Sequence, residues 1–220
     1  MPAETRTLGM FPLSTVLFPH ARLPLHVFET RYRALMADCR GQDGEFGVVL
    51  IARGSEVGGG DQRVDVGTLA RISRLSELDD GRMLVLAEGV RRLRVCRWLT
   101  DDPYPRAVVT DSPDDGAADD RIDPARPEAQ AVAAGEDAVR RLRSLLSELG
   151  DVPALPHDLE ISGTAEAIGW QVCELAPLNL IDRQRLLSTV SLTARMGLLA
   201  DLSNAMADDV VGMLAGGLGG

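Results

Sequence analysis

Short apolar runs separated by turn-forming residues make up most of the first half of the chain. These runs span residues 8–13, 15–18, 23–28, 46–53, 64–75, 82–89, 90–99 and 104–111. Turn clusters such as EVGGGD, LDDG and DDP lie between them. Runs of this length and spacing predict the short β-strands of a barrel or a sandwich. Pro12, Pro19 and Pro24 each remove a backbone donor, so we expect the first strands at sheet edges or at bulges.

One helix is predicted among these strands and four helices after them. From Glu29 onward, apolar residues recur at i, i+3, i+4 and i+7, namely at Tyr32, Leu35, Met36 and Cys39. This spacing places all four on one helix face, which must pack against the sheet. Four later stripes also have helical spacing, and they run from Val139 to Leu149, Ile168 to Leu175, Leu186 to Val190 and Leu192 to Met206. Helices of such unequal length predict an α-helical bundle, so the fold class is α+β.

The charge of the chain changes sharply at its middle. Residues 1–110 carry 15 arginines and 14 acidic residues, whereas residues 111–220 carry 8 arginines and 19 acidic residues. Residues 111–130 hold seven acids and three prolines with almost no large apolar side chain, which is typical of a mobile connector. We therefore predict a β domain over 1–112, an acidic Pro-rich connector over 113–130, a helical bundle over 131–214 and a flexible tail over 215–220.

All 23 basic residues are arginine, and this excludes several kinds of catalysis. A P-loop, a Schiff-base site and a Ser-Lys peptidase each need the amine of a lysine, which a guanidinium does not replace. There is no Gly-x-Ser-x-Gly motif and no dinucleotide fingerprint either. The sequence thus predicts a protein that is not an enzyme and has neither ATPase nor peptidase activity.

The cysteines and histidines predict no metal site and no cofactor. Cys39, Cys96 and Cys173 are far apart, and His20 and His26 are remote from His157. None of these spacings is that of a zinc knuckle or a disulfide framework. No segment is long and apolar enough to cross a membrane, and the first residues lack the pattern of a secretory signal, so we expect a cytoplasmic protein.

The opening block LGMFPLSTVLFPHARLPLHVFETRYRALM resembles the start of the substrate-binding domain of Lon proteases. The matching residues are Phe11-Pro12-Leu13, Val16-Leu17-Phe18-Pro19, Leu23 to Glu29 and Tyr32-Arg33. His20 stands where the family usually has glycine. Later segments such as FGVVL, VGTLARI, GVRRLRV and YPRAVV are similar to strands of the family, and residues 181–187 are similar to an element of its helical part.

The resemblance implies a PUA-like antiparallel β-barrel with one inserted helix, followed by an α-helical bundle. It also implies a protein-recognition role in quality control, in which client or unfolded proteins are bound and passed to a protease or chaperone. The ATPase and peptidase domains of Lon are absent from these 220 residues. An adaptor without catalysis is therefore the expected function.

Four residues are candidates for binding a client segment: Phe18, Leu25, Phe28 and Tyr32. Apolar runs broken by proline leave backbone groups unpaired at a sheet edge, where an extended peptide can add as a strand. The alternative is that the same side chains form the core and the face of the inserted helix. His26 and Glu29 are assigned structural roles, a buried hydrogen bond for His26 and an attraction to the helix N-terminus for Glu29.

Arg91, Arg92, Arg94 and Arg97 concentrate positive charge on one predicted strand and form a candidate anion patch. They make an RNA-binding PUA-like protein the second hypothesis, although the net charge of −10 opposes phosphate binding. A solvated strand face that contacts the acidic connector or bundle is the alternative. A third hypothesis is a structural subunit, and the helical stripes leave open whether their apolar faces form a bundle core, a homo-oligomer or a partner groove.

Overall fold

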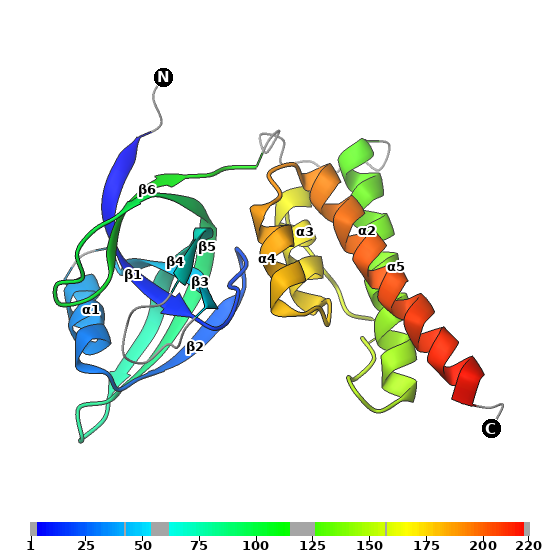
Figure 1. The fold of residues 1–220 in the computed structure, drawn as a ribbon, viewed down its shortest axis with the longest axis horizontal. Coiled ribbons are helices and arrows are strands. Elements are labelled where there is room, and N and C mark those ends of the chain that lie inside the picture. Colours follow the sequence, from blue (N-terminus) through cyan, green and yellow to red (C-terminus); the bar gives the residue numbers. More distant parts are fainter. Residues whose placement is uncertain (1–3, 42, 54–61, 115–125, 157, 218–220) are drawn as a thin grey trace. The chain divides into compact units, whose positions relative to one another are not determined.

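Strands and helices separate along the chain into two units. The computed structural model describes residues 4–41, 43–53, 62–114, 126–156 and 158–217 (Figure 1). Its contacts divide the chain into Met1–Pro113 and Asp114–Gly220. The first unit contains the strands and one helix, and the second contains helices, so the α+β class is confirmed.

The first unit is built on one sheet whose strands return to their starting point. Its elements are β1 (Thr5–Leu13), β2 (Arg22–Val27), α1 (Thr30–Arg40), β3 (Glu45–Arg53), β4 (Gln62–Glu77), β5 (Met83–Trp98) and β6 (Arg106–Asp111). The strand order is β2-β5-β4-β3-β1-β6, and β5 also pairs with β6. The strands β5, β4, β3, β1 and β6 therefore form a ring, to which β2 is attached through β5. The PUA-like barrel stays a prediction.

The strand pairings differ from the expected all-antiparallel arrangement at one place. β1 and β3 run parallel, with Met10 opposite Gly47, while the other pairs are antiparallel. Parallel neighbours need a crossover connection, and the segment that holds β2 and α1 supplies it. Side chains from all five ring strands fill the interior, namely Leu8, Met10, Val49, Leu69, Leu93, Val95, Ala107 and Val109.

Helix α1 packs on the sheet as its sequence spacing predicts. Tyr32, Leu35, Met36 and Cys39 are all buried. The ring of Tyr32 stacks on Phe11 with centroids 4.0 Å apart. The Tyr104 hydroxyl donates a hydrogen bond to Asp38 Oδ2 (2.7 Å), and burial together with this bond raises the pKa of Tyr104 to about 12. Phe11 of β1 and Tyr104 of the β5–β6 connection thus both hold the helix in place.

Three of the predicted strands differ from the observed ones. Residues 15–18 form no strand, and residues 82–89 and 90–99 form the single strand β5. Gly89 lies inside that strand because the backbone at Phe18 passes too close for a side chain. Pro12 lies inside β1 but beyond the part of β1 that pairs with β6, Thr5–Gly9. Its missing donor is therefore tolerated there.

His20 adopts a backbone conformation that favours glycine. Its φ is 65°, and its N–H donates to the carbonyl oxygen of Gly89 (2.7 Å). A left-handed conformation destabilises a residue with a Cβ by roughly 1–2 kcal/mol. The variant His20→Gly is therefore expected to be at least as stable as wild type, with a gain of up to about 1 kcal/mol after the entropy of the unfolded glycine is counted. Urea unfolding measures this, and His20→Ala, which keeps the strain, is the control. A marked loss of stability in His20→Gly would show that the imidazole itself holds the turn.

The second unit consists of helices packed through small residues. Its elements are α2 (Pro127–Glu148), α3 (Ala165–Leu175), α4 (Leu180–Ser188) and α5 (Leu192–Gly217). A methyl group on Gly135 of α2 would lie 2.5 Å from the Met196 side chain of α5, so glycine lets these helices approach closely. The interior side chains include Leu142, Trp170, Leu186, Leu187, Met196 and Leu199.

Two predicted boundaries of this half need correction. Helix α2 begins at Pro127, inside the predicted connector, because proline is well suited to the first position of a helix. Helix α5 continues to Gly217, so it extends into the predicted tail over 215–220. Residues 115–125 of the predicted connector lie outside the described residues.

A buried ion pair ties the start of this unit to its longest helix. Both guanidinium Nη atoms of Arg195 donate to the carboxylate of Asp114, one at 3.1 Å, and the Arg195 side chain is fully buried. Arg195 also donates to the Thr189 carbonyl oxygen (3.2 Å), and its guanidinium carbon lies 3.5 Å from the centre of the Trp170 ring. Asp114 is the first residue of the second unit, so this ion pair lies within that unit.

Candidate functional site

Strand β2 lies at an edge of the sheet, where only some of its free backbone groups could pair with an added strand. It lies at the end of the strand order, and among the described strands it pairs with β5 alone. Gly89 donates its N–H to the Ala21 carbonyl oxygen (2.9 Å), and the register from Arg22 to Val27 is unbroken. In an antiparallel strand, the N–H and C=O groups of one residue point to one edge, and those of the next residue point to the opposite edge. Ala21 faces β5, so residues 22, 24 and 26 direct these groups to the free edge. Pro24 has no N–H, so a donor is missing in the middle of this edge.

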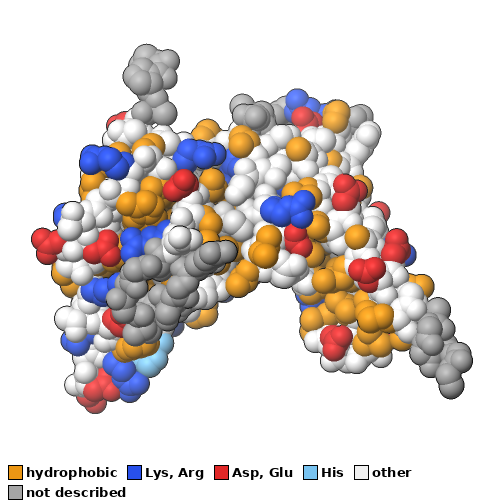
Figure 2. All heavy atoms as spheres, in the orientation of Figure 1, with side chains coloured by type: hydrophobic (Ala, Val, Ile, Leu, Met, Phe, Trp, Pro, Cys, Tyr) orange, Lys and Arg blue, Asp and Glu red, His pale blue; other side chains and the backbone are white. Residues whose placement is uncertain are grey.

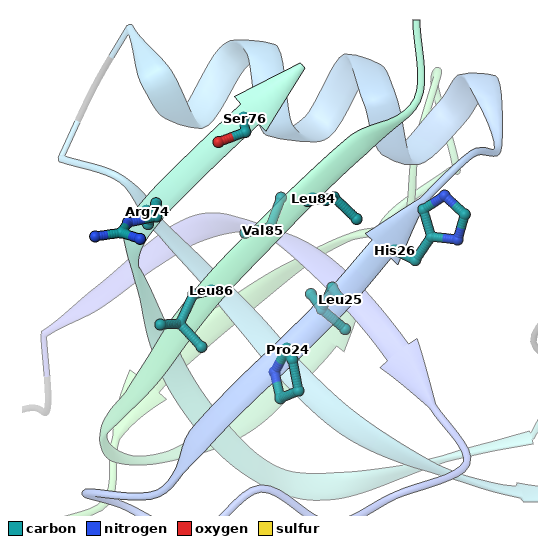
Figure 3. A pocket seen from close by; sticks show the side chains of 8 residues that line it. All are labelled: Pro24, Leu25, His26, Arg74, Ser76, Leu84, Val85 and Leu86. Atoms are coloured by element: carbon teal, nitrogen blue, oxygen red, sulfur yellow. The ribbon is translucent and has the colours of Figure 1, made fainter. Parts of the chain in front are cut away.

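Two hollows adjoin β2. A groove of about 550 Å³ is lined by Pro24, Leu25, His26, Arg74, Ser76, Leu84, Val85 and Leu86. These side chains come from the neighbouring strands β2, β5 and β4 (Figure 3). A second hollow of about 180 Å³ is lined by Phe11, Leu13, Pro24, Leu25, His26, Val27, Phe28, Glu29 and Tyr32. Pro24, Leu25 and His26 line both, so we call the two hollows together the β2 surface.

The β2 surface exposes large apolar side chains. Phe28 directly follows β2 and is 56% exposed, and Leu84 lies in β5 and is 48% exposed. On the face shown in Figure 2, hydrophobic and arginine side chains are interspersed over the strand unit. Exposed apolar side chains beside a hollow are typical of a binding surface for an apolar ligand.

The four predicted peptide-binding residues have different environments. Phe18 is fully buried and Tyr32 is 3% exposed, so both belong to the core, as the alternative interpretation holds. Leu25 is half-buried and lines both hollows. Phe28 is exposed and lines the smaller hollow, which Tyr32 also lines. The structure thus brings Leu25, Phe28 and Tyr32 together and places Phe18 in the interior.

His26 and Glu29 also lie at the β2 surface. His26 is exposed, with its ring centroid 6.1 Å from that of Phe28, so the predicted buried hydrogen bond is wrong. The alternation of β2 turns residues 24 and 26 outward, whereas Leu23 and Val27 face the core. Glu29 is the residue before α1, and its carboxylate accepts a hydrogen bond from Arg31 Nε (3.0 Å). Glu29 therefore lies at the N-terminus of α1, which is the position predicted for it.

The predicted anion patch is not one continuous surface. Arg91 forms an ion pair with Asp111 (2.7 Å). Arg92 is buried and donates to the carbonyl oxygen of Pro113 (3.1 Å). Arg94 and Arg97 are exposed, and a shift in the register with β6 lies between Val95 and Arg97. Two of the four arginines therefore contact the start of the acidic segment, which weakens the case for phosphate binding.

Two of the three cysteines are buried, Cys39 and Cys173. Burial raises the pKa of the Cys39 thiol to about 11 and that of the Cys173 thiol to about 12. Both thiols are therefore protonated and unreactive near neutral pH. No group of three or more metal-binding side chains occurs in the described parts of the chain. Across the same residues, every helix falls short of the length and apolarity that a membrane span requires.

Comparison with known families decides what kind of domain this is. The family model described as the ATP-dependent protease La (LON) substrate-binding domain matches residues 7–204. The chain belongs to this family. The resemblance inferred from residues 8–36 is thereby confirmed, and the match extends over both units of the LON substrate-binding domain.

Individual relatives agree with this assignment. Lon protease 2 of Myxococcus xanthus is 28% identical over 202 residues, which are 90% of this chain and 24% of that protein. A crystal structure of a Lon N-terminal domain protein from Xanthomonas campestris has a TM-score of 0.62 at 29% identity and covers 88% of this chain and 96% of that chain. The N-terminal domain of a Mycobacterium avium complex Lon protease, at 16% identity and a TM-score of 0.58, shares the fold. The chain spans about a quarter of the length of the curated Lon proteases it matches.

Several residues of the β2 surface were not singled out from the sequence of this LON substrate-binding domain. They are Arg74, Ser76, Leu84 and Leu86. A signal for the two leucines does exist, because Met83 to Ala87 is an unbroken apolar run in an antiparallel strand. Such a strand needs apolar residues on one face only, so half of the run must face outward unless another element covers it.

Proposed function

We propose that this protein is a non-catalytic recognition module that binds extended apolar segments of client proteins at the β2 surface. One observation carries the proposal: the exposed Phe28 side chain lines the smaller of two hollows that share Pro24, Leu25 and His26 of the edge strand β2. Membership of a substrate-binding domain family supports the same role. An unfolded client supplies the apolar side chains that these hollows accept.

The missing donor of Pro24 indicates how the segment is held. A strand added along β2 would find N–H groups at Arg22 and His26 but none between them. Backbone pairing therefore contributes less than at an ordinary sheet edge, and side-chain contacts contribute more. Weak, side-chain-based binding suits a module that releases its clients, and we propose that it passes them to a separate protease or chaperone in the cytoplasm.

Nucleic-acid binding has less support from the geometry. Arg91 is neutralised by Asp111, and Arg92 is buried. The helical unit offers an alternative binding surface, because it also exposes large apolar side chains, namely Leu149, Leu180, Ile181, Val211, Met213 and Leu214. A test of the proposal must therefore separate the strand unit from the helical unit.

The variant Phe28→Ala is expected to weaken binding of an extended apolar peptide about tenfold, because a buried aromatic anchor contributes a large share of binding energy. Fluorescence anisotropy with a labelled apolar peptide measures the affinity. Stability should change by less than about 0.5 kcal/mol, since the side chain is mostly exposed.

Ile181→Ala is the matched control, because Ile181 is an apolar side chain that is 74% exposed on the helical unit. We expect it to bind the peptide as wild type does. A loss of affinity in Ile181→Ala with none in Phe28→Ala would place the site on the helices and reject the β2 surface. Strong, salt-sensitive binding of single-stranded RNA by the wild-type protein would favour the nucleic-acid alternative.

A further inference from the structure

The register of three strands defines the charges around the larger groove. Exposed and half-buried side chains of β2, β5 and β4 form three cross-strand rows on one face, which are Arg22–Glu88–Arg71, Pro24–Leu86–Arg74 and His26–Leu84–Ser76. Side chains directly opposite each other in such rows have Cβ atoms about 5 Å apart. Leu86 and Leu84 thus occupy the middle of the second and third rows, and the first row consists of charged residues.

Arg74 differs from the other charged residues of this face. Arg71 already donates to Glu45 Oε1 (2.7 Å), and Glu88 lies between Arg22 and Arg71 in its own row. Arg74 is exposed, and within the described residues it forms no ion pair. No Asp or Glu lines the groove. Its guanidinium is therefore an uncompensated positive charge at the edge of an apolar groove (Figure 3).

We propose that Arg74 makes the groove selective for extended apolar segments that carry an aspartate or glutamate next to their apolar residues. This inference rests on the proposed function and adds the chemical class of the segment. The apolar side chains of the segment contact Leu84, Leu86 and Pro24, and its carboxylate pairs with Arg74. A lysine at the same place meets a like charge and no carboxylate of the groove, so basic apolar segments are rejected.

The test uses three peptides with the same apolar centre, flanked at both ends by Asp, Asn or Lys. We expect the full 220-residue protein to bind the Asp peptide roughly two- to fivefold more tightly than the Asn peptide, as for a partly exposed ion pair, and the Lys peptide most weakly. The preference should shrink as the salt concentration rises, because the pair is screened. Fluorescence anisotropy at low and high ionic strength gives both results.

Variants of Arg74 separate charge selection from apolar binding. Arg74→Gln should bind the Asn peptide as wild type does and lose the preference for the Asp peptide. Arg74→Glu should reverse the order and prefer the Lys peptide. The control is Arg94→Gln, which removes an exposed arginine at the other end of β5, and it should keep the wild-type order.

The outcomes distinguish the two proposals. If the wild-type protein binds all three peptides equally, the charge selectivity is refuted while the proposed function stands. If it binds none of them, the proposed function fails and the selectivity with it. If Arg94→Gln loses the preference for the Asp peptide and Arg74→Gln keeps it, the peptide carboxylate binds elsewhere on the sheet. The assignment to Arg74 is then overturned.

Discussion

Replacing Asp114 by asparagine is expected to lower the free energy of unfolding of the helical unit by about 3–5 kcal/mol, because it leaves a buried guanidinium without its counter-charge. Arg195 is fully buried, and its remaining polar partner is the carbonyl oxygen of Thr189. Domains are stable by only about 5–15 kcal/mol, so the variant should lose most of the stability of this unit. The first unit should be unaffected.

Tryptophan fluorescence can follow the helical unit alone. The chain has two tryptophans, Trp98 in the strand unit and Trp170 beneath Arg195. In a Trp98→Phe background, urea unfolding of Trp170 reports on the helices. The matched control is Asp208→Asn, which breaks an Arg–Asp pair whose Asp side chain is 69% exposed, and it should change stability by less than about 1 kcal/mol.

A double variant separates the effect of the buried charges on stability from the effect of side-chain shape at the same site. Replacing Asp114 by Leu and Arg195 by Met removes both charges, and such replacements are often neutral or stabilising. We expect the double variant to be more stable than Asp114→Asn. An unfolding midpoint of Asp114→Asn equal to that of wild type would show that the pair contributes nothing and that the helical unit does not begin at Asp114.

Replacing Gly89 by alanine is expected to destabilise the strand unit by roughly 3 kcal/mol, because the new methyl group would meet backbone atoms. Its ideal position lies 2.2 Å from the carbonyl oxygen of Phe18 and 3.2 Å from the Cα of Pro19. Relief of this overlap must move the segment before β2, which the hydrogen bonds of Gly89 to His20 and Ala21 hold in place. Peptide binding at the β2 surface should fall in parallel.

Hydrogen exchange followed by mass spectrometry measures this effect by segment. Amides of β2 and β5 should exchange faster in Gly89→Ala, while those of the helical unit should not change. Gly197→Ala is the control, since nothing lies within 4 Å of its added methyl group and it lies inside α5. It should stabilise the helical unit by about 0.5–1 kcal/mol. Unchanged protection of β2 and β5 in Gly89→Ala would contradict the close approach.

The candidate site was only partly predictable from the sequence. Leu25 and Phe28 were found because apolar residues beside prolines indicate a sheet edge. Phe18 belongs to the same apolar pattern, yet it is buried, because the segment before β2 turns inward beneath Gly89. Arg74 and Leu84 come from strands far along the chain, and only the register of β4 and β5 places them beside β2.

Local patterns determined what depends on neighbours in the chain. The stripe of α1, the strand-rich first half, the helical second half and the family resemblance all follow from residues a few positions apart, because helix and strand periodicity are local properties. Tertiary structure alone decided the merging of two runs into β5, the place of Arg74 beside β2 and the pairing of Asp114 with Arg195, 81 residues away. Each of these depends on which distant backbone or charge lies against a residue, and no pattern of nearby residues records that.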